Sequence, residues 1–242
     1  MIKKFIRTTA EYLTNTNIFR SLPRGGCVFN DISVALPQFK FNVIFDVGAN
    51  VGQSAKSYVK QMPKSTIYCF EPVHETFKTL QINTKHYSQV KCYNCALSSE
   101  EGVGKIVKQE KSSRNYMISE EDVANFDDDE LETIEVGTLD RFCLEERISK
   151  ISYLKIDTEG RDFEVLLGSQ DKIRSQNVDF IEVETGMSVF NDKHVPFCEI
   201  KSHLENSGYH LFGIYEQIAE WPERKPNLRR VNSVYIANNL VE

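Results

Sequence analysis

The fold is decided by one stretch of sequence, Val43-Ile-Phe-Asp-Val-Gly-Ala-Asn-Val-Gly52. Its first five residues form an apolar run with a single acid, as in a buried parallel strand. A glycine turn follows, and the next segment places Ala55, Val59 and Met62 at helical spacing. A strand, a glycine turn and a helix in this order are typical of the start of an α/β fold.

The same alternation continues toward the C-terminus. Strand-like runs followed by amphipathic segments predict a parallel sheet with helices on both faces. The expected strands are Val43–Val47, Thr66–Phe70, Val90–Leu97, Tyr153–Asp157 and Val178–Glu184, with a further extended piece over Lys105–Gln109. The amphipathic segments are expected to form helices. Their inward-facing residues are Val73, Phe77 and Leu80 in one helix, Phe163, Leu166, Leu167 and Ile173 in the next, and Phe197, Ile200 and Leu204 in the last.

The end of the chain predicts an antiparallel pair. Gly208 stands where a helix commonly stops in a left-handed conformation. The runs Tyr209–Tyr215 and Val231–Ala237, joined by a polar connection, are then expected to form a hairpin at one edge of the sheet.

The length and composition fit one domain with an N-terminal extension. A chain of 242 residues that is 40% hydrophobic can bury one sizeable core. We expect residues 41–242 to form the domain and residues 1–40 an extension, with a helix that places Ile2, Phe5, Ile6, Thr9 and Leu13 on one face. No run approaches the roughly 20 apolar residues of a membrane span, and no secretory signal is evident, so a cytoplasmic protein is expected.

The charge is unevenly distributed. The formal net charge is −6, and eight acidic residues fall between positions 120 and 132. The 119–132 segment is expected to be a solvated loop, and the nearly neutral remainder lacks a basic patch, so no nucleic-acid partner is expected. The six cysteines lie scattered, several in apolar runs, which favours reduced thiols; Cys92 and Cys95 are interpreted as core thiols rather than a metal or redox pair.

Acids and glycines coincide at the ends of the first two strands. Ligands of open parallel sheets bind beyond the carboxyl ends of the strands. Asp46 ends the first strand, and Glu71 follows the second, where a carboxylate can accept both hydroxyls of a ribose. The backbone can approach a ligand closely at Gly48 and Gly52, which bracket Ala49 and Asn50, and Pro72 follows Glu71.

The loop favours a ligand that joins a nucleoside to an amino acid. It is not GxGxxG, and it lacks the Lys-Ser/Thr of a phosphate loop. Asp46 would repel a phosphate but can stabilise an ammonium group, which favours S-adenosylmethionine over a dinucleotide. The alternatives are that Asp46 caps a helix, that the glycines only form a tight turn, and that Glu71 is a solvated strand-end residue.

Several motifs resemble the FkbM family of methyltransferases. They are Ile44-Phe-Asp-Val-Gly-Ala-Asn-Val-Gly52, Phe70-Glu-Pro72, Thr138-Leu-Asp140 and the most specific one, Lys155-Ile-Asp-Thr-Glu-Gly160. Later motifs resemble the family at Phe180–Gly186, Gly208–Phe212 and Arg229–Ala237, so the resemblance covers about Phe41 to Asn238. It implies a class I, Rossmann-like α/β fold with a mostly parallel seven-stranded sheet. It also implies S-adenosylmethionine as donor and O-methylation of a hydroxyl on a sugar, glycan or secondary metabolite.

Carboxylates at the next two strand ends are candidates for the chemistry. The fourth strand delivers Asp157 and Glu159 to the ligand edge, and the fifth delivers Glu184. We expect Asp157 to be the general base, with Glu184 second. Glu159 is expected to shape the turn or the acceptor pocket, and Lys155 to orient a carboxylate or hold the acceptor oxygen. The alternatives are helix capping by Asp157 and Glu159 and an ordinary salt bridge at Lys155.

Other readings stay open. Clustered carboxylates could bind Mg²⁺ or Ca²⁺, although a metal-free site is expected. His194 could contact the acceptor or simply start a surface helix. A non-catalytic subunit or regulator could bind S-adenosylmethionine through the same fold, whereas a nucleotide-linked oxidoreductase would prefer GxGxxG.

Overall fold

The protein is described by a computed structural model that covers residues 22–107, 116–118, 126–127, 130–220 and 225–241. The chain divides into two units, Met1–Phe39 and Lys40–Glu242. In the first unit, helix α2 (Val28–Ala35) is held by Asp31, whose Oδ2 accepts a hydrogen bond from the Gly25 N–H at 2.7 Å. The helix expected to carry Ile2 to Leu13 lies outside the described residues.

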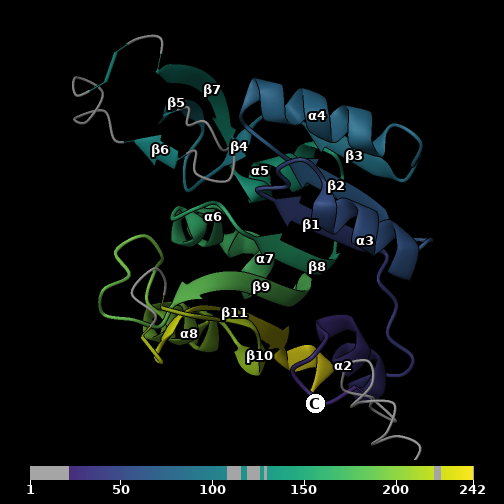
Figure 1. The fold of residues 1–242 in the computed structure, drawn as a ribbon. Helices are drawn as coiled ribbons and strands as arrows, with labels where there is room; N and C mark the ends of the chain where they lie inside the picture. Colours follow the sequence, from purple (N-terminus) through teal and green to yellow (C-terminus); the bar gives the residue numbers. More distant parts are fainter. Residues whose placement is uncertain (1–21, 108–115, 119–125, 128–129, 221–224, 242) are drawn as a thin grey trace, which may run out of the picture. The chain divides into compact units, whose positions relative to one another are not determined.

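The second unit is built on a mostly parallel sheet of seven strands (Figure 1). Their spatial order is β10 (Tyr209–Ala219), β11 (Leu228–Ala237), β9 (Val178–Gly186), β8 (Ile151–Ile156), β1 (Val43–Val47), β2 (Thr66–Phe70) and β3 (Val90–Tyr93). β11 runs antiparallel to β9 and β10, which confirms the C-terminal hairpin. β1 pairs in parallel with β2 and β8, and the strand order reverses here, at the point where such sheets bind ligands.

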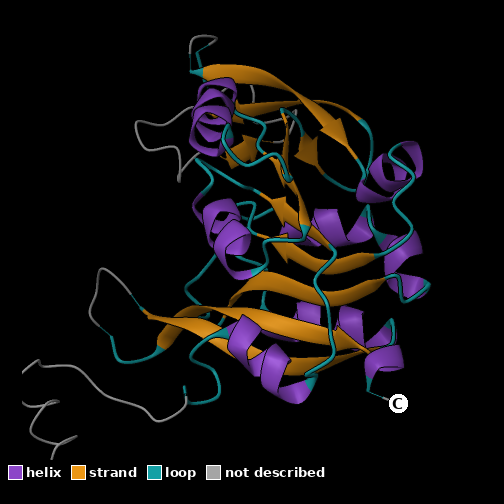
Figure 2. Ribbon diagram, turned by 90° about the vertical axis from the view of Figure 1, so that its right-hand side faces the viewer, coloured by secondary structure: helices purple, strands orange, loops and turns teal. Residues whose placement is uncertain are grey.

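Helices cover both faces of this sheet (Figure 2). They are α3 (Gln53–Gln61), α4 (His74–Thr84), α5 (Leu139–Glu145), α6 (Asp162–Leu167), α7 (Gln170–Arg174) and α8 (Phe197–Asn206), with a 3-10 turn, η3 (Asn238–Leu240), near the end. Leu154 of β8 belongs to the core cluster that includes residues of α5 to α8. Its neighbour Tyr153 points the other way, with its ring 6.5 Å from that of Tyr58 on α3. The expected α/β fold is therefore confirmed.

A second sheet, of four strands, was not expected from the sequence. Its order is β4 (Ala96–Leu97), β7 (Leu131–Gly137), β5 (Gly102–Val107) and β6 (Tyr116–Ile118). The prediction of a single strand over Val90–Leu97 is wrong, because these residues form the two strands β3 and β4. The chain leaves β3 before Asn94, whose side-chain amide donates to the carbonyls of Glu71 and Pro72 at 2.9 and 2.8 Å. This turn redirects the following residues into the second sheet.

The prediction of an acidic loop over residues 119–132 is wrong at the C-terminal end of this range. Leu131 and Glu132 already belong to β7, where Leu131 is buried and Glu132 accepts a hydrogen bond from the His74 N–H at 2.7 Å. Residues 119–125 and 128–129 lie outside the described part of the chain. Exposed and buried residues alternate over residues 133–136 of β7, so a short strand signal was present but was masked by its acidic neighbours.

The helix expected after β8 is two short helices. α6 ends at Leu167 and α7 begins at Gln170, with Gly168 between them. A Cβ at Gly168 would lie 1.9 Å from the carbonyl oxygen of Ser98, so this close approach of two backbones requires glycine. By contrast, α8 does end as expected, with Gly208 at a φ of +82° after its last residues.

The buried faces of α3 and α4 also differ from the expected ones. α3 buries Ala55 as expected, and Met62 directly after the helix is also buried, but Tyr58 is buried in place of Val59. α4 buries Leu80 as expected, but it also buries Thr76 and Thr84, so its inner face is partly polar, whereas Val73 and Phe77 were expected there. Val73 is buried, but it precedes the helix as its N-cap residue.

Helix α5 explains the Thr138–Asp140 motif. The Thr138 hydroxyl accepts the Arg141 N–H at 3.2 Å and so caps the helix. The Asp140 carboxylate accepts the N–H groups of Asp171 and Lys172 at 2.8 and 3.0 Å, which joins α5 to the start of α7. This motif therefore supports the packing of two helices.

Candidate active site

A pocket of about 310 Å³ opens at the carboxyl ends of β1, β2 and β8. Its wall combines the loop after β1, the residues that follow β2 and β8, and part of the second sheet. The lining residues are Val47, Gly48, Ala49, Asn50, Gln53, Ser54, Phe70, Glu71, Pro72, Val73, Cys95, Ala96, Leu97, Ile106, Lys155, Asp157, Thr158, Glu159 and Arg161.

The loop after β1 is held between the two neighbouring strands. The N–H groups of Gly48 and Ala49 donate to the Phe70 carbonyl at 3.0 and 2.9 Å, and the Asp157 N–H donates to the Val47 carbonyl at 3.0 Å. Gly48 has a φ of +83°, and a Cβ there would lie 1.9 Å from the Asp157 carbonyl oxygen. Only glycine fits this crossing, which brings the backbone of the loop to the pocket wall.

Glu71 fastens this loop and also lines the pocket. Its Oε2 accepts the Asn50 N–H and its Oε1 accepts the Val73 N–H, each at 3.0 Å. Burial raises the pKa of Glu71 to about 7, although the two N–H groups act in the opposite direction. Each carboxylate oxygen has a second lone pair, so Glu71 can accept ligand hydroxyls while it holds the loop.

Asp46 is fully buried and does not belong to the pocket lining. Both of its carboxylate oxygens lack a hydrogen-bond partner among the described residues. It stands in register with Lys155 on β8, which stands in register with Glu182 on β9. Burial raises the pKa of Asp46 to about 6, while the positive charge of Lys155 opposes the rise. A buried carboxylate without a donor is costly, so a cationic ligand group nearby would stabilise it.

Lys155 and Asp157 form an ion pair at the pocket. The Lys155 Nζ lies 2.7 Å from the Asp157 Oδ2, and the Asp157 side chain is 34% exposed. Burial tends to raise the pKa of Asp157, but Lys155, helped by Arg230 and His194, outweighs it and sets the pKa below its usual value. Asp157 is therefore ionised at neutral pH, and Lys155 contacts one of its two carboxylate oxygens.

Glu159 sits in a strained turn after β8. Its φ is +57°, and Gly160 follows with a φ of +110°. The Glu159 carboxylate is ion-paired with Lys193, and a Cβ at Gly160 would lie 2.6 Å from the Lys193 carbonyl oxygen. The turn is thus built to meet the segment that follows β9.

Helix capping does not account for the acids of this turn. The N-cap residue of α6 is Arg161, and no side chain caps the helix. The hydroxyl and N–H of Thr158 instead both donate to Asp162 Oδ1, at 3.1 and 2.9 Å. Asp157 and Glu159 are consequently available to the pocket that they line.

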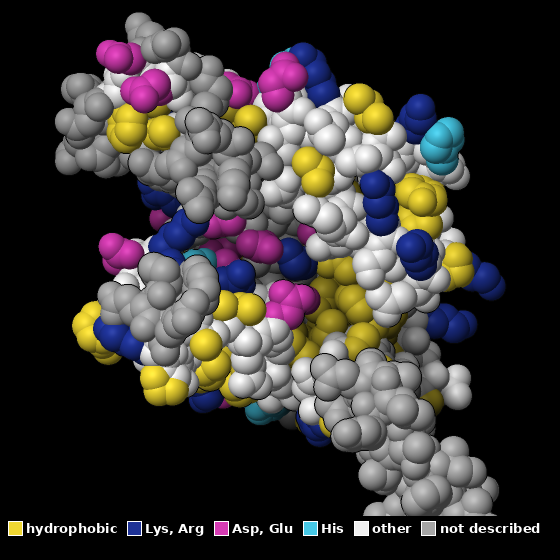
Figure 3. All heavy atoms as spheres, in the orientation of Figure 1, with side chains coloured by type: hydrophobic (Ala, Val, Ile, Leu, Met, Phe, Trp, Pro, Cys, Tyr) yellow, Lys and Arg dark blue, Asp and Glu magenta, His cyan; other side chains and the backbone are white. Residues whose placement is uncertain are grey.

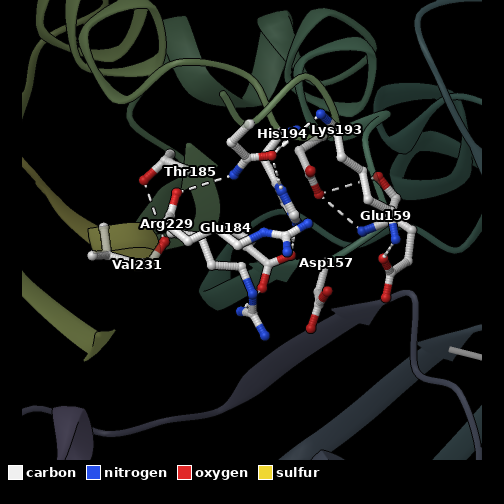
Figure 4. Close-up of polar contacts among 12 residues, drawn as sticks. Asp157, Glu159, Glu184, Thr185, Lys193, His194, Arg229 and Val231 are labelled. Carbon is white, nitrogen blue, oxygen red and sulfur yellow. Dashed lines mark hydrogen bonds and ion pairs between the residues drawn. The ribbon is translucent and has the colours of Figure 1, made fainter. Parts of the chain in front are cut away.

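Glu184, on β9, is buried outside the pocket lining (Figure 4). Its Oε1 accepts a hydrogen bond from Arg230, and its Oε2 lies 2.5 Å from the Nε2 of His194. The Nδ1 of His194 lies 3.0 Å from the Oδ1 of Asn191. Burial lowers the pKa of His194, while Asp162 and Glu159 act to raise it. His194 is thus a buried residue rather than a surface one.

The pocket brings together most of the residues chosen from the sequence. The lining contains Gly48, Ala49, Asn50, Glu71 and Pro72 from the cofactor set and Lys155, Asp157 and Glu159 from the catalytic set. Asp46, Gly52 and Glu184 lie outside it. Gly52, the N-cap residue of α3, has a φ of +88°. A Cβ there would lie 2.8 Å from Leu80 Cδ1, so its role is close packing against α4.

A buried polar group behind Lys155 was missed by sequence reasoning. Glu182 accepts hydrogen bonds from the Tyr153 hydroxyl and from Asn232 Nδ2, the latter at 2.6 Å. Burial raises the pKa of Glu182, and Lys155 opposes the rise. The available signal was the pair of acids spaced by two in an otherwise apolar strand, Glu182 and Glu184, because such residues share one face of a strand.

Acidic and basic side chains gather in a hollow on the face shown in Figure 3. Within the described ranges, no group of three or more His, Cys, Asp or Glu residues has a metal-binding arrangement. No helix in the described part of the chain is long and apolar enough to cross a membrane.

Comparisons with known proteins agree with this architecture. The family model described as methyltransferase FkbM domain matches residues 46–211. "Methyltransferase 1" of Beauveria bassiana (strain ARSEF 2860) is 26% identical over 183 residues, which cover 69% of this chain and 71% of the relative. "2-O-methyltransferase NoeI" of Sinorhizobium fredii (strain NBRC 101917 / NGR234) is 22% identical over 197 residues, or 74% of each chain.

The fold is also similar to solved methyltransferase structures. The METTL16 MTase domain matches with a TM-score of 0.51 at 10% identity, over 96% of this chain and 77% of that one. This likeness concerns the fold, whereas the family match covers more than half of the sequence. The chain therefore belongs to the methyltransferase FkbM domain family and is a methyltransferase.

Proposed function

We propose that this methyltransferase uses S-adenosylmethionine to methylate a hydroxyl group of a sugar, on a glycan or a small metabolite. The observation that carries the proposal is the position of Asp157. It lines the same pocket as Glu71, stays ionised beside Lys155, and keeps one carboxylate oxygen without a partner from the described residues. A base in the lining of a pocket of about 310 Å³ suits proton removal from an acceptor bound there.

The residues present fit S-adenosylmethionine. Glu71 offers carboxylate lone pairs at the pocket wall for ribose hydroxyls, and the apolar wall formed by Leu97 and Ile106 suits an adenine ring. Because Gly48 has no Cβ, the loop can pass close to the backbone after β8, with which a Cβ would collide. The Asp46 carboxylate, which has no hydrogen-bond partner among the residues that the structure describes, lies just before this loop and would supply negative charge toward an ammonium group.

Asp157 and Lys155 have complementary tasks in this reaction. When bound, S-adenosylmethionine supplies a methyl group on a sulfonium, whose sulfur keeps the electron pair as the methyl carbon joins the acceptor oxygen. Asp157 accepts the hydroxyl proton through its second oxygen while Lys155 holds the first. Lys155 also provides positive charge beside the base, so we expect thorough chelation of metal ions to leave the rate unchanged.

The acceptor class is supported by the surroundings of the pocket. Charged side chains that are already paired, such as Glu159 with Lys193, present many donors and acceptors to neutral polyhydroxy compounds. The name of the relative NoeI, a 2-O-methyltransferase, is in keeping with an oxygen acceptor. We therefore propose a sugar hydroxyl rather than a nucleic acid base.

The test is a transfer assay with S-adenosylmethionine labelled in its methyl group. The full chain is incubated with a panel of methyl glycosides of common hexoses and deoxyhexoses, and label in each product is measured with and without a chelator. Label in at least one glycoside supports the proposal. Binding of S-adenosylhomocysteine without transfer to any acceptor would favour a non-catalytic subunit, and absence of binding would contradict the proposal outright.

A further inference from the structure

A buried network links β9 and β11 to residues 187–196, called here the 187–196 segment (Figure 4). The side chains of His194 and Glu184 are only 5% and 6% exposed, and their Nε2 and Oε2 atoms lie 2.5 Å apart. Arg230 donates to the other oxygen of Glu184. Asn191 stands on the far side of the imidazole. The protonation of His194 can be derived from these contacts.

The amide of Asn191 has one possible orientation. Its Nδ2 donates to the Arg229 carbonyl at 3.0 Å, and a carbonyl can only accept. Its Oδ1 accepts the N–H groups of Lys193 and His194 at 3.2 and 3.3 Å. The atom that faces His194 Nδ1 at 3.0 Å is therefore an acceptor, so Nδ1 must carry a proton.

The second ring nitrogen must also share a proton. Two lone pairs cannot approach to 2.5 Å, so a proton lies between His194 Nε2 and Glu184 Oε2. Arg230 is always positively charged, and its contact with Oε1 favours the carboxylate form of Glu184. The proton is therefore assigned to the imidazole, which becomes a buried imidazolium between Asn191 and Glu184.

The charges around His194 are mixed, and burial opposes its positive charge. The acids Asp162 and Glu159 favour the proton, whereas Lys193 and Arg229 disfavour it. Asp157 responds to the charge of His194, and Arg230 adds a cation from β11. Burial, together with Lys193 and Arg229, holds the pKa of His194 below its usual value. The contact with the Glu184 carboxylate acts against them, and the proton is assigned on this geometry because it is the closest of these interactions and both partners are buried.

We propose that His194 is a positioning residue: as a doubly protonated imidazole it ties the 187–196 segment to Glu184 and so fixes the acceptor side of the site. The segment meets the pocket directly, because Lys193 pairs with the lining residue Glu159. Both oxygens of Glu184 are then occupied, which leaves proton removal to Asp157. The functional part of this inference rests on the proposed methyl transfer; the protonation state does not.

Nitrogen-15 NMR of the full chain tests the protonation state without any acceptor. At pH 7 we expect both ring nitrogens of His194 to be protonated in the wild-type protein. In Glu184→Gln the neutral amide cannot hold the imidazolium, so one nitrogen should lose its proton. A singly protonated His194 in the wild type would overturn the proposal, and so would an unchanged doubly protonated ring in Glu184→Gln.

A second measurement tests positioning. In His194→Gln one amide cannot replace both N–H donors, so amide hydrogen exchange in the 187–196 segment should accelerate about tenfold or more. The KM for the best methyl glycoside should rise by a similar factor, with S-adenosylhomocysteine affinity unchanged. The control is His210→Gln, an exposed histidine on β10. Wild-type exchange and KM in His194→Gln would contradict positioning, whereas failure of the wild type to bind S-adenosylhomocysteine would sink only the proposed function.

Discussion

Asp157 illustrates how one neighbour sets the chemistry of a carboxylate. Its burial alone would favour the protonated acid, but Lys155 at 2.7 Å keeps it ionised. Asp46, in register with the same lysine, accepts no hydrogen bond from the described residues, and burial raises its pKa to about 6. Lys155 thus keeps Asp157 ionised but leaves the pKa of Asp46 raised, and of these two acids only Asp157 lines the pocket.

Substitution of the base should separate catalysis from cofactor binding. In Asp157→Asn the side chain keeps its size but cannot accept the hydroxyl proton, so kcat should fall by roughly 10²–10⁴-fold. Affinity for S-adenosylhomocysteine, measured by calorimetry, should stay within about twofold because the rest of the pocket is intact. Asp171→Asn, at an exposed position, is the control. Wild-type turnover in Asp157→Asn would remove Asp157 from the mechanism.

The buried acid Asp46 should make stability depend on pH. Its folded pKa of about 6 exceeds the ordinary 3.8, so the folded state keeps a proton that the unfolded chain has released. Its contribution to stability therefore falls as pH rises from about 4 to 6. Asn cannot ionise, so Asp46→Asn should gain up to about 3 kcal/mol relative to wild type between pH 4 and pH 8.

Urea unfolding at both pH values, with Asp171→Asn as the control, measures this difference. The same stability difference at pH 4 and pH 8 would show that Asp46 does not ionise within the folded core.

At the scale of elements, local patterns predicted the strands and the glycine loop but failed where distant contacts decide. β1 and β2 coincide with the expected residues because apolar runs mark buried strands. The break at Asn94 depends on hydrogen bonds to Glu71 and Pro72, more than 20 residues away, and no local pattern records them. The break at Gly168 likewise depends on the backbone of Ser98.

The strand–loop–helix element requires glycine at its first turn. In Gly48→Ala the new methyl group would meet the Asp157 carbonyl, at a φ of +83° that favours glycine. We expect a loss of at least about 2 kcal/mol in the free energy of unfolding, with S-adenosylhomocysteine affinity also lost. Gly102→Ala is the matched control, because a Cβ there meets no atom within 4 Å. Equal stability of the two variants would contradict this account of the loop.

In the second unit, the groups proposed to contact the cofactor and the acceptor lie at β2, β8 and β9 of one sheet. Glu71 follows β2, Asp157 follows β8, and Glu184 lies on β9, so the site extends across the carboxyl edge. The sequence predicted Glu71 and Asp157 at the ends of their strands, but it placed Glu184 at the end of a strand that in fact continues to Gly186. It could not predict that His194 and Arg230 contact the two carboxylate oxygens of Glu184. These residues lie 10 and 46 positions further along the chain, and no sequence pattern links them to Glu184.

The pocket between β1, β2 and β8 is proposed to bind S-adenosylmethionine. Calorimetric titration of S-adenosylhomocysteine at pH 8, where Glu71 is ionised, tests it with the wild type, Glu71→Ala and the exposed control Glu75→Ala. We predict one site in the wild type and the control, and at least about tenfold weaker binding in Glu71→Ala. Absence of binding to the folded wild type, or equal affinity in all three proteins, would contradict the account.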